Sequence, residues 1–307
     1  MKPVEIVKDL FFIERGYLNG NHFVYRGGAP VLIDTAYISD FAETERLINE
    51  VGVDLSDVRL IVTTHCHCDH IGGNKIIQER SGCDIFLHKA GKHFMDRRDS
   101  WSPWWDYYDQ EAAFFEATKA LDDGDVVAAG PHEFEVIHTP GHASDGIVLY
   151  NRKERILLSS DTLWEKDMAV MTLPIEGNSA LQDMLGSLEK ISSLDIDVVF
   201  PGHGRPFTDV DEALSQSRNR IRGFLEDPHE VGLDVLKKII IYTLLMRRAV
   251  DENTFFATLM ESHWFKETVD LYLDGECKPR YDEMMHGLMR KGVVRRKEGK
   301  LFTIIRP

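Results

Sequence analysis

Six consecutive residues of the chain, 65–70, read HCHCDH and combine side chains that bind metal ions. Imidazole, thiolate and carboxylate groups are the usual ligands of zinc, iron and manganese. His65 and His67 follow an apolar run at residues 58–62 that predicts a strand. Because strand side chains alternate, both imidazoles can point to one side, and Asp69 and His70 follow where the chain must turn. The run alone leaves three readings open: a metal site, a redox cysteine pair, or a polar loop.

Three more candidate ligands each follow a predicted strand. His142 lies in HTPGHASDG, Asp161 in LLSSDTLW and His203 in VVFPGHGRPF. A lone histidine beside a Pro-Gly turn is usually a loop residue, so each segment is weak evidence. Four strand-end segments of this kind in one chain favour a site for two metal ions, because so many buried polar groups need an ion to satisfy them.

The two cysteines of the run, Cys66 and Cys68, occupy the positions between the candidate ligands. Their side chains should point away from a metal, so we expect two small buried spacers. A redox pair is the alternative, but bridging residues this close together requires special Cα geometry.

Aromatic residues are dense between residues 89 and 125. The segment predicts either a lid with an apolar wall beside the metal site or a flap that packs on the body or on a second subunit. The first reading predicts a substrate with a bulky apolar acyl group. The candidate substrate-binding residues are Trp101, Trp104, Trp105, Tyr107, Tyr108 and Trp164.

The elements that must position these residues change in type along the chain. Strand-like runs at 10–14, 21–25, 30–34, 58–62, 84–88, 134–138, 146–150, 155–159 and 197–200 alternate with helical spacing such as 40–51. From about residue 215 the pattern is mostly helical, and the chain closes with an alternating hairpin around Glu298-Gly299. We therefore expect an α/β catalytic domain at 1–226 and a winged-helix-like domain at 227–307.

Composition places limits on the function. The chain has 307 residues, 43% hydrophobic residues and a formal net charge of −15. This balance argues against broad binding to nucleic acid or to anionic membranes. We found no run of 18 apolar residues and no signal-peptide pattern, and four cysteines without such a signal predict a reducing, cytoplasmic location.

The ligand segments resemble the metallo-β-lactamase superfamily in type and order: HCHCDH, PGH, SDTL and PGHG. The resemblance covers about the first 205 residues and implies an αββα sandwich. It also implies that His65, His67 and His142 hold one metal, that Asp69, His70 and His203 hold the other, and that Asp161 bridges them. Asp34, in VLIDTAY, resembles the family's aspartate that orients a histidine ligand, although a simple turn residue is equally consistent.

The family resemblance implies a hydrolase with two divalent metal ions, zinc first and iron or manganese as alternatives, that uses a metal-bound hydroxide. Asp69 would also accept a proton. The HIGGN, TPGH and DTLW segments are most similar to glyoxalase II, which favours a thioester or an activated ester or lactone as substrate. The C-terminal region resembles members of the family that carry a winged helix, such as beta-lactamase-like protein 2.

Two alternative activities remain open. The basic C-terminal hairpin allows a phosphodiesterase or ribonuclease, as in some winged-helix relatives. The H-C-H-x-D-H variant also resembles persulfide dioxygenases, in which the equivalents of His65, His142 and Asp161 hold a single iron. We expect a small-molecule substrate, no nucleic-acid partner and no membrane partner, and a homodimer stays open.

Overall fold

The computed structural model describes residues 2–307, and its first sheet contains seven strands in sequence order. Strands β1 to β4 run antiparallel, and β4 to β7 run parallel. Parallel neighbours bring their carboxyl ends to one edge, and that edge carries the first part of the site. The strands are β1 (Val4–Val7), β2 (Leu10–Ile13), β3 (His22–Tyr25), β4 (Val31–Ile33), β5 (Leu60–Val62), β6 (Asp84–His88) and β7 (Lys119–Leu121).

The second sheet has five strands in the order β12-β11-β10-β9-β8. Only β11 and β12 pair in parallel. Its strands are β8 (Val126–Ala129), β9 (His132–His138), β10 (Ile147–Asn151), β11 (Ile156–Ser160) and β12 (Val198–Pro201).

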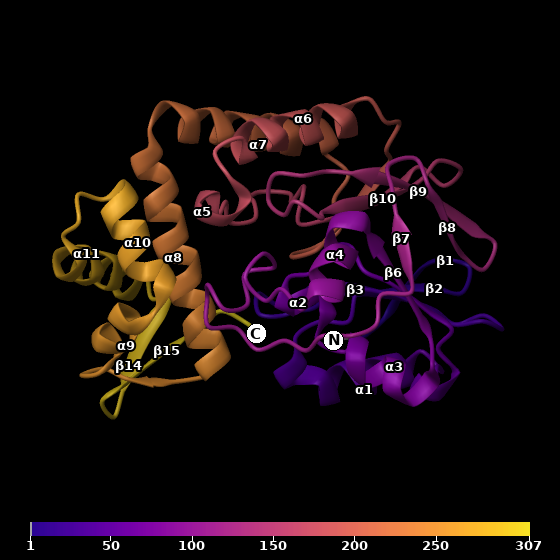
Figure 1. Cartoon of the computed structure of the whole chain (residues 1–307), viewed down its shortest axis with the longest axis horizontal. Helices are drawn as coiled ribbons and strands as arrows, with labels where there is room; N and C mark the ends of the chain where they lie inside the picture. Colours follow the sequence, from indigo (N-terminus) through magenta and orange to yellow (C-terminus); the bar gives the residue numbers. More distant parts are fainter. Residues whose placement is uncertain (1) are drawn as a thin grey trace.

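The two sheets face each other across an apolar layer. Phe12 of the first sheet packs against Phe200 of the second with ring centroids 5.2 Å apart, and Phe134 and Leu158 lie in the same buried cluster. The helices α1 (Phe41–Glu50) and α3 (Asn74–Ser81) lie on one side of the sheets, and α6 (Ala180–Ser192) and α7 (Val210–Glu226) lie on the other (Figure 1). The predicted αββα sandwich is therefore confirmed.

The predicted strands and the first helix agree with the structure to within about two residues at each end. Phe41, Leu47 and Ile48 form the buried face of α1, as their spacing predicts. Sequence analysis missed β1, β7 and β8. These strands are short and partly exposed, so they lack the apolar run that marks a buried strand.

The aromatic segment is mostly irregular. It begins with α4 (Lys89–Arg97), continues through turns at residues 101–109 and joins β7. Trp104 and Asp109 have positive φ values of 72° and 52°, a conformation that helices exclude. The segment is therefore held in place by contacts with the body and not by regular structure.

The C-terminal region consists of helices and a small sheet. A helix break falls at Asp227, where Pro228 begins α8 and the Asp227 carboxylate caps it by accepting from the backbone N–H of His229. This break lies at the predicted domain boundary, and the division into two domains stays a prediction. The elements are α8 (Pro228–Arg247), α9 (Phe255–Glu261), α10 (His263–Tyr272), α11 (Cys277–Arg290), β13 (Val250–Asp251), β14 (Val294–Lys297) and β15 (Lys300–Thr303).

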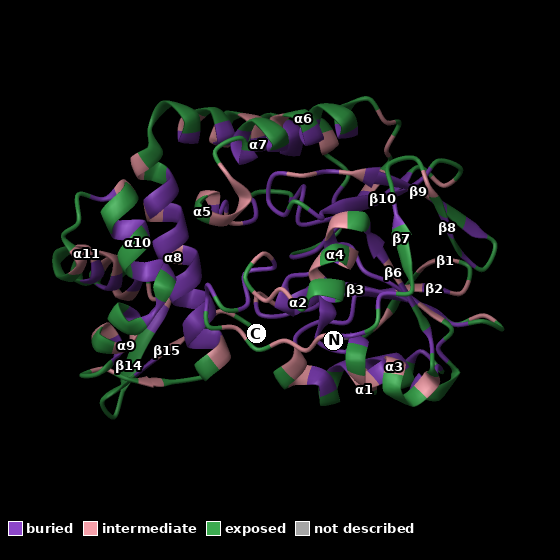
Figure 2. Cartoon of the chain, viewed as in Figure 1, coloured by how far each residue is buried: buried purple, intermediate pink, exposed green. Residues whose placement is uncertain are grey.

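Helix α8 joins the C-terminal region to the catalytic body. It is buried along most of its length (Figure 2). The Lys238 ammonium donates to the Met168 carbonyl at 2.6 Å, and the Tyr242 hydroxyl donates to the Leu18 carbonyl at 3.3 Å. Ile240 and Leu244 of α8 belong to the same apolar core as Ile61 of β5. One face of α8 is therefore a wall of the site.

The hairpin predicted around Glu298-Gly299 is present as β14 and β15, and β13 adds a third strand beside β15. Helices followed by such a hairpin fit the winged-helix expectation, which stays a prediction. Among residues 2–307, no helix has both the length and the apolar character needed to cross a bilayer. The cytoplasmic location also stays a prediction.

Candidate metal centre

The residues of the HCHCDH run lie at the carboxyl end of β5. His65 and His67 lie in the loop that follows the strand, and Asp69 and His70 lie on the single-turn helix α2 (Cys68–Ile71). All four side chains are buried. Gly72 permits this tight turn, because a Cβ there would lie 2.2 Å from the backbone nitrogen of Ile38.

The second sheet contributes the other three candidate ligands at the same edge. His142 lies in the loop after β9, Asp161 directly follows β11, and His203 follows β12. All three are buried. The structure therefore brings together all seven residues for which metal binding was predicted.

The candidate ligands form three overlapping groups, in each of which the ligand atoms lie within 4.8 Å of one another. One group contains His65, His67 and His142. Another contains Asp69, His70 and His203. His65, His70 and Asp161 form the group that links the other two. The first two groups are those that the family resemblance implies.

Asp161 lies between the two groups. Its Oδ1 is 3.5 Å from Nε2 of His70, and its Oδ2 is 3.6 Å from Nε2 of His142 and 3.7 Å from Nε2 of His203. These separations are longer than hydrogen bonds. The carboxylate therefore lies beside histidines of both groups and can act as a bridging ligand.

Asp34 fixes the orientation of His70. Its Oδ2 accepts hydrogen bonds from Nδ1 of His70 at 2.8 Å and from the Thr64 hydroxyl at 2.7 Å, while its Oδ1 accepts from the Thr64 backbone N–H at 2.8 Å. A proton on Nδ1 leaves the lone pair on Nε2, which points into the site. The contact supports the orienting role for Asp34 over that of a simple turn residue.

Two other histidines are oriented by backbone carbonyls. Nδ1 of His142 lies 2.8 Å from the Val170 carbonyl oxygen, and Nδ1 of His203 lies 3.1 Å from that of Gly16. Each contact selects the tautomer that carries its proton on Nδ1. The opposite nitrogen, Nε2, then carries the lone pair that can bind a metal.

The residues present fit a metal, because five of their inward atoms have no hydrogen-bond partner. Nε2 of His65, His67, His70 and His142, and Oδ1 of Asp161, are buried without a hydrogen-bond partner among residues 2–307. A buried polar atom without a partner costs about 1–3 kcal/mol. Five such atoms directed into one site are difficult to explain unless cations satisfy them.

Burial controls the protonation of the first group. It lowers the pKa of His65, His67 and His142, because a charged imidazole loses its hydration there. Neutral imidazole is the form that binds a metal. These three residues are therefore favoured in the ligating form over the physiological pH range.

Neighbouring carboxylates control the protonation of the second group. Burial acts to lower the pKa of His70 and of His203, but Asp161 and Asp69 outweigh it and raise both values. Burial likewise acts to raise the pKa of Asp161, and the His203 and His70 imidazoles hold it well below its usual range. Asp161 is thus a carboxylate, the form that a cation requires.

A small cavity of about 60 Å³ opens beside the two groups. The Trp104 ring packs on His67 with centroids 3.7 Å apart, and the Trp164 ring lies 5.1 Å from that of His203. Nε1 of Trp164 is buried without a partner among the described residues. Tyr17, Ile239 and Tyr242 also line the cavity, which is therefore mostly apolar.

Four of the six aromatic residues predicted to bind substrate do not line this cavity. Trp105 is buried and donates from Nε1 to the Cys66 carbonyl at 2.9 Å. Tyr107 and Tyr108 are buried in the apolar core, and the Tyr108 hydroxyl lies 2.7 Å from that of Thr172. Trp101 is 44% exposed and lies beside another surface pocket.

Cys66 and Cys68 are free thiols, and both are buried. No ligand group among residues 2–307 contains either of them. Burial raises the pKa of both thiols, which disfavours thiolate. The Cys66 backbone N–H donates to the Asp145 carboxylate at 2.9 Å, a contact that holds the loop between the first two histidines.

Sequence analysis missed several residues that build the walls of the site. Lys238 is buried on α8 and donates to the Met168 carbonyl at 2.6 Å. Glu176 of α5 (Leu173–Glu176) accepts from Nε1 of Trp104 at 2.7 Å and so fixes the ring that covers His67. Their partners are far away in the sequence, and no local pattern marks them.

Comparison with known families agrees with this geometry. Residues 15–203 match the model of the Metallo-beta-lactamase superfamily, and this range includes every candidate ligand. The chain belongs to this superfamily. It is a metal-dependent hydrolase, and its His/Asp cluster is suited to metal ions.

Curated members of the superfamily are similar to most of the chain. The probable metallo-hydrolase YqjP of Bacillus subtilis is 25% identical over 279 residues, which are 78% of this chain and 84% of that protein. The human acyl-coenzyme A thioesterase MBLAC2 is 27% identical over 229 residues, 64% of this chain and 79% of that protein. A beta-lactamase-like protein 2 homolog of Caenorhabditis elegans is 28% identical over 222 residues, which are 69% of this chain and 68% of that protein.

Solved structures of the superfamily share the fold. A family protein of Thermus thermophilus, TTHA1429, has a TM-score of 0.62 at 22% identity and covers 97% of this chain, with 99% of its own length matched. The subclass B3 enzyme BJP-1 of Bradyrhizobium japonicum has a TM-score of 0.58 at 18% identity, with 76% and 96% of the two chains covered. At these identities the likeness concerns the fold alone.

Proposed function

We propose that this protein is a thioesterase with two divalent metal ions, and that it hydrolyses thioesters with an apolar acyl group. The observation that carries the proposal is the pair of ligand groups that share Asp161, beside a cavity walled by Trp104 and Trp164. The thioesterase name of the relative MBLAC2 supports the substrate class. Zinc suits a ligand set of imidazoles and carboxylates, and iron or manganese are the alternatives.

The metal ions would be held by His65, His67 and His142 in one group, by Asp69, His70 and His203 in the other, and by Asp161 between them. When bound, they would lower the pKa of a water molecule from about 16 to about 7 and polarise the carbonyl oxygen of the substrate.

The residues of the chain position the reactants and move the proton. Asp69, whose Oδ2 lies 3.1 Å from Nε2 of His203, is placed to accept a proton from the attacking water. The water oxygen forms a bond to the carbonyl carbon, the carbon–sulfur bond breaks, and Asp69 returns the proton to the departing thiolate. The products are a thiol and a carboxylic acid, and the acid releases its proton to solvent at neutral pH to leave a carboxylate.

The apolar wall excludes water from the acyl side. The rings of Trp104 and Trp164 flank the ligand groups, so a long or bulky acyl chain gains more contact area there than a short one. The unpartnered Nε1 of Trp164 can donate a hydrogen bond to a substrate oxygen.

The direct test is hydrolysis by protein of known metal content. Release of free thiol from short- and long-chain acyl-coenzyme A should require the metal and should be lost in D69A. Glutathione thioesters, lactones and bis-(p-nitrophenyl) phosphate, assayed in parallel, distinguish the neighbouring activities. Phosphodiester cleavage without thioester cleavage would replace this proposal with the phosphodiesterase alternative.

The complete second ligand group argues against a single-iron persulfide dioxygenase. In that alternative only His65, His142 and Asp161 would serve, and the unpartnered Nε2 of His70 would have no function. One iron per chain together with oxygen consumption on a persulfide substrate would reverse the choice.

A further inference from the structure

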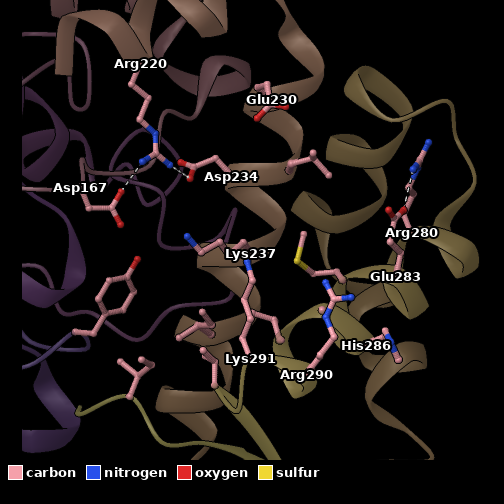
Figure 3. Close-up of a pocket in the computed structure, with 18 of the residues that line it drawn as sticks. Asp167, Arg220, Glu230, Asp234, Lys237, Arg280, Glu283, His286, Arg290 and Lys291 are labelled. Atoms are coloured by element: carbon pink, nitrogen blue, oxygen red, sulfur yellow. Dashed lines mark hydrogen bonds and ion pairs between the residues drawn. The ribbon is translucent and has the colours of Figure 1, made fainter. Parts of the chain in front are cut away.

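A second and much larger cleft, of about 930 Å³, lies beside the metal centre between the catalytic body and the C-terminal helices. Its volume is that of sites that hold cofactor-sized ligands. Figure 3 shows its side chains extending from α7, α8 and α11 toward a common space. Its charged residues are Asp167, Arg220, Glu230, Asp234, Lys237, Arg280, Glu283, Arg290 and Lys291.

Several of these charges neutralise one another. Arg220 pairs with Asp167 at 2.9 Å and also with Asp234, which additionally pairs with the buried Lys238. These pairs form a network at one end of the cleft, and they leave little net charge there.

Other cations of the cleft have no such partner. Arg280 pairs with Glu283 at 2.9 Å, whereas Lys237, Arg290 and Lys291 form no ion pair with any residue in 2–307. Among the carboxylates that line the cleft, in the part of the chain that the structure describes, only Glu230 forms no ion pair. Three unpaired cations against one carboxylate stand out in a chain whose formal net charge is −15.

The three unpaired cations come from two neighbouring segments. Lys237 extends from the middle of α8, Lys291 follows the last residue of α11 and extends toward α8, and Arg290 lies beside Lys291 (Figure 3). Lys237 is half-buried, so its ammonium has lost part of its hydration without gaining an ionic partner. Such a group favours an anionic ligand.

The cleft adjoins the metal centre, and Tyr17 lies between them. The Tyr17 ring lines both cavities and lies 6.1 Å from the ring of His203. Helix α8 also borders both, with Lys237 and Ile241 toward the cleft and Ile239 toward the small cavity. The small cavity can hold only the reacting part of a large substrate, so the remainder must lie outside it.

We propose that this cleft binds the phosphorylated thiol carrier of the substrate, with Lys237, Arg290 and Lys291 on its phosphates. The proposal rests on the thioesterase function and names its substrate class: acyl thioesters of a nucleotide-bearing thiol, as in acyl-coenzyme A. The acyl group would lie against Trp104, and the thiol arm would pass Tyr17 into the cleft. Leu233 and Met284 supply apolar contacts for the nucleotide base.

The first test measures binding without any reaction. Adenosine 3′,5′-bisphosphate carries phosphates on a nucleoside but no thiol and no acyl group, and its affinity for the metal-loaded protein can be measured by calorimetry. We expect K237Q, R290Q and K291Q each to weaken binding about threefold to tenfold, and the losses to shrink at high salt. R222Q is the control: it neutralises an exposed arginine of α7 that does not line the cleft, and it should leave the affinity unchanged.

The second test compares two thioesters with the same acyl group. The three variants should raise KM for the acyl-coenzyme A substrate and leave kcat/KM for the N-acetylcysteamine thioester, which has no phosphate, at the wild-type value. If the protein hydrolyses neither substrate but still binds the bisphosphate through these cations, the thioesterase function is wrong. The anion site is then still supported.

The cleft proposal itself is overturned in two ways. One is a wild-type protein that does not bind the bisphosphate, or variants that bind it as well as the wild type does. The second is tighter binding of a single-stranded RNA oligomer than of the bisphosphate, with affinity for the RNA reduced in the same three variants. That result would show that the cleft binds nucleic acid.

Discussion

The carboxylate of Asp34 accepts a hydrogen bond from Nδ1 of His70 at 2.8 Å, with both side chains fully enclosed by the protein. The pair forms at the turn after β4, where Asp34 has a positive φ of 58°. An aspartate in this conformation directs its side chain across the end of β5. The metal-facing nitrogen of His70 is therefore oriented by a residue 36 positions earlier in the chain.

Replacing Asp34 with asparagine should weaken metal binding about 10- to 100-fold, the range found when such orienting partners are lost. Asparagine tolerates the positive φ, and its oxygen can still accept from the Thr64 backbone. Its amide nitrogen, however, cannot accept from His70. Competition with a chelator measures the affinity, and circular dichroism of D34N checks that the fold is intact. An unchanged metal affinity would contradict the orienting role.

Each of the two ligand groups should hold one metal ion. We expect about two ions per chain in the wild type and about one in both H142A and H203A, because each variant removes a ligand of only one group. Elemental analysis by mass spectrometry measures the ratio. H93A, a substitution of an exposed histidine on α4, is the control and should retain the wild-type content. If the wild type contains one ion per chain and H142A contains none, the protein has a single-metal site and the prediction is wrong.

Trp104 should select for large acyl groups. It covers His67, whereas Trp105, its neighbour, is turned into the core. We therefore expect W104A to reduce kcat/KM about tenfold or more for long-chain acyl thioesters and only slightly for acetyl thioesters, because a short chain does not reach the ring. W101A, on the exposed face, should behave like the wild type. Equal losses for short and long chains would assign Trp104 a purely structural role.

The clustering of the candidate metal ligands was predictable from the sequence because its signals are local. His65 and His67 are two residues apart just after an apolar strand, and Asp161 and His203 lie within two residues of the ends of strands that share a sheet. Strand ends at one sheet edge lie close together, so the predicted strands indicated which candidate ligands share an edge, and the packing of the two sheets brings the two edges together.

The walls of the site could not be predicted in this way. Lys238 contacts Met168, 70 residues earlier, and Glu176 contacts Trp104, 72 residues earlier. Those contacts depend on how helices and loops pack, which no short pattern encodes. The aromatic segment shows the same limit: composition predicted a wall, but the turns decide that Trp104 faces the site and Trp105 faces the core.

Glu176 should make stability depend on pH. Burial raises its pKa from 4.5 to about 8, although the hydrogen bond from Trp104 acts in the opposite direction. The folded protein therefore retains a proton that the unfolded chain releases, so this carboxyl's contribution to stability falls as pH rises from about 4.5 to about 8.

We expect the free energy of unfolding of the wild type, relative to E176Q, to fall by on the order of 2 kcal/mol between pH 5 and pH 8. This is less than a fully buried carboxyl of that pKa would give, because Glu176 is only half-buried. Glutamine keeps the acceptor for Trp104 but does not titrate, so the difference between the two proteins isolates this group. Urea unfolding at four or five pH values, with equal metal content, provides the measurement. A difference that stays constant with pH would show that the Glu176 carboxyl titrates at the same pH in the folded and unfolded chains.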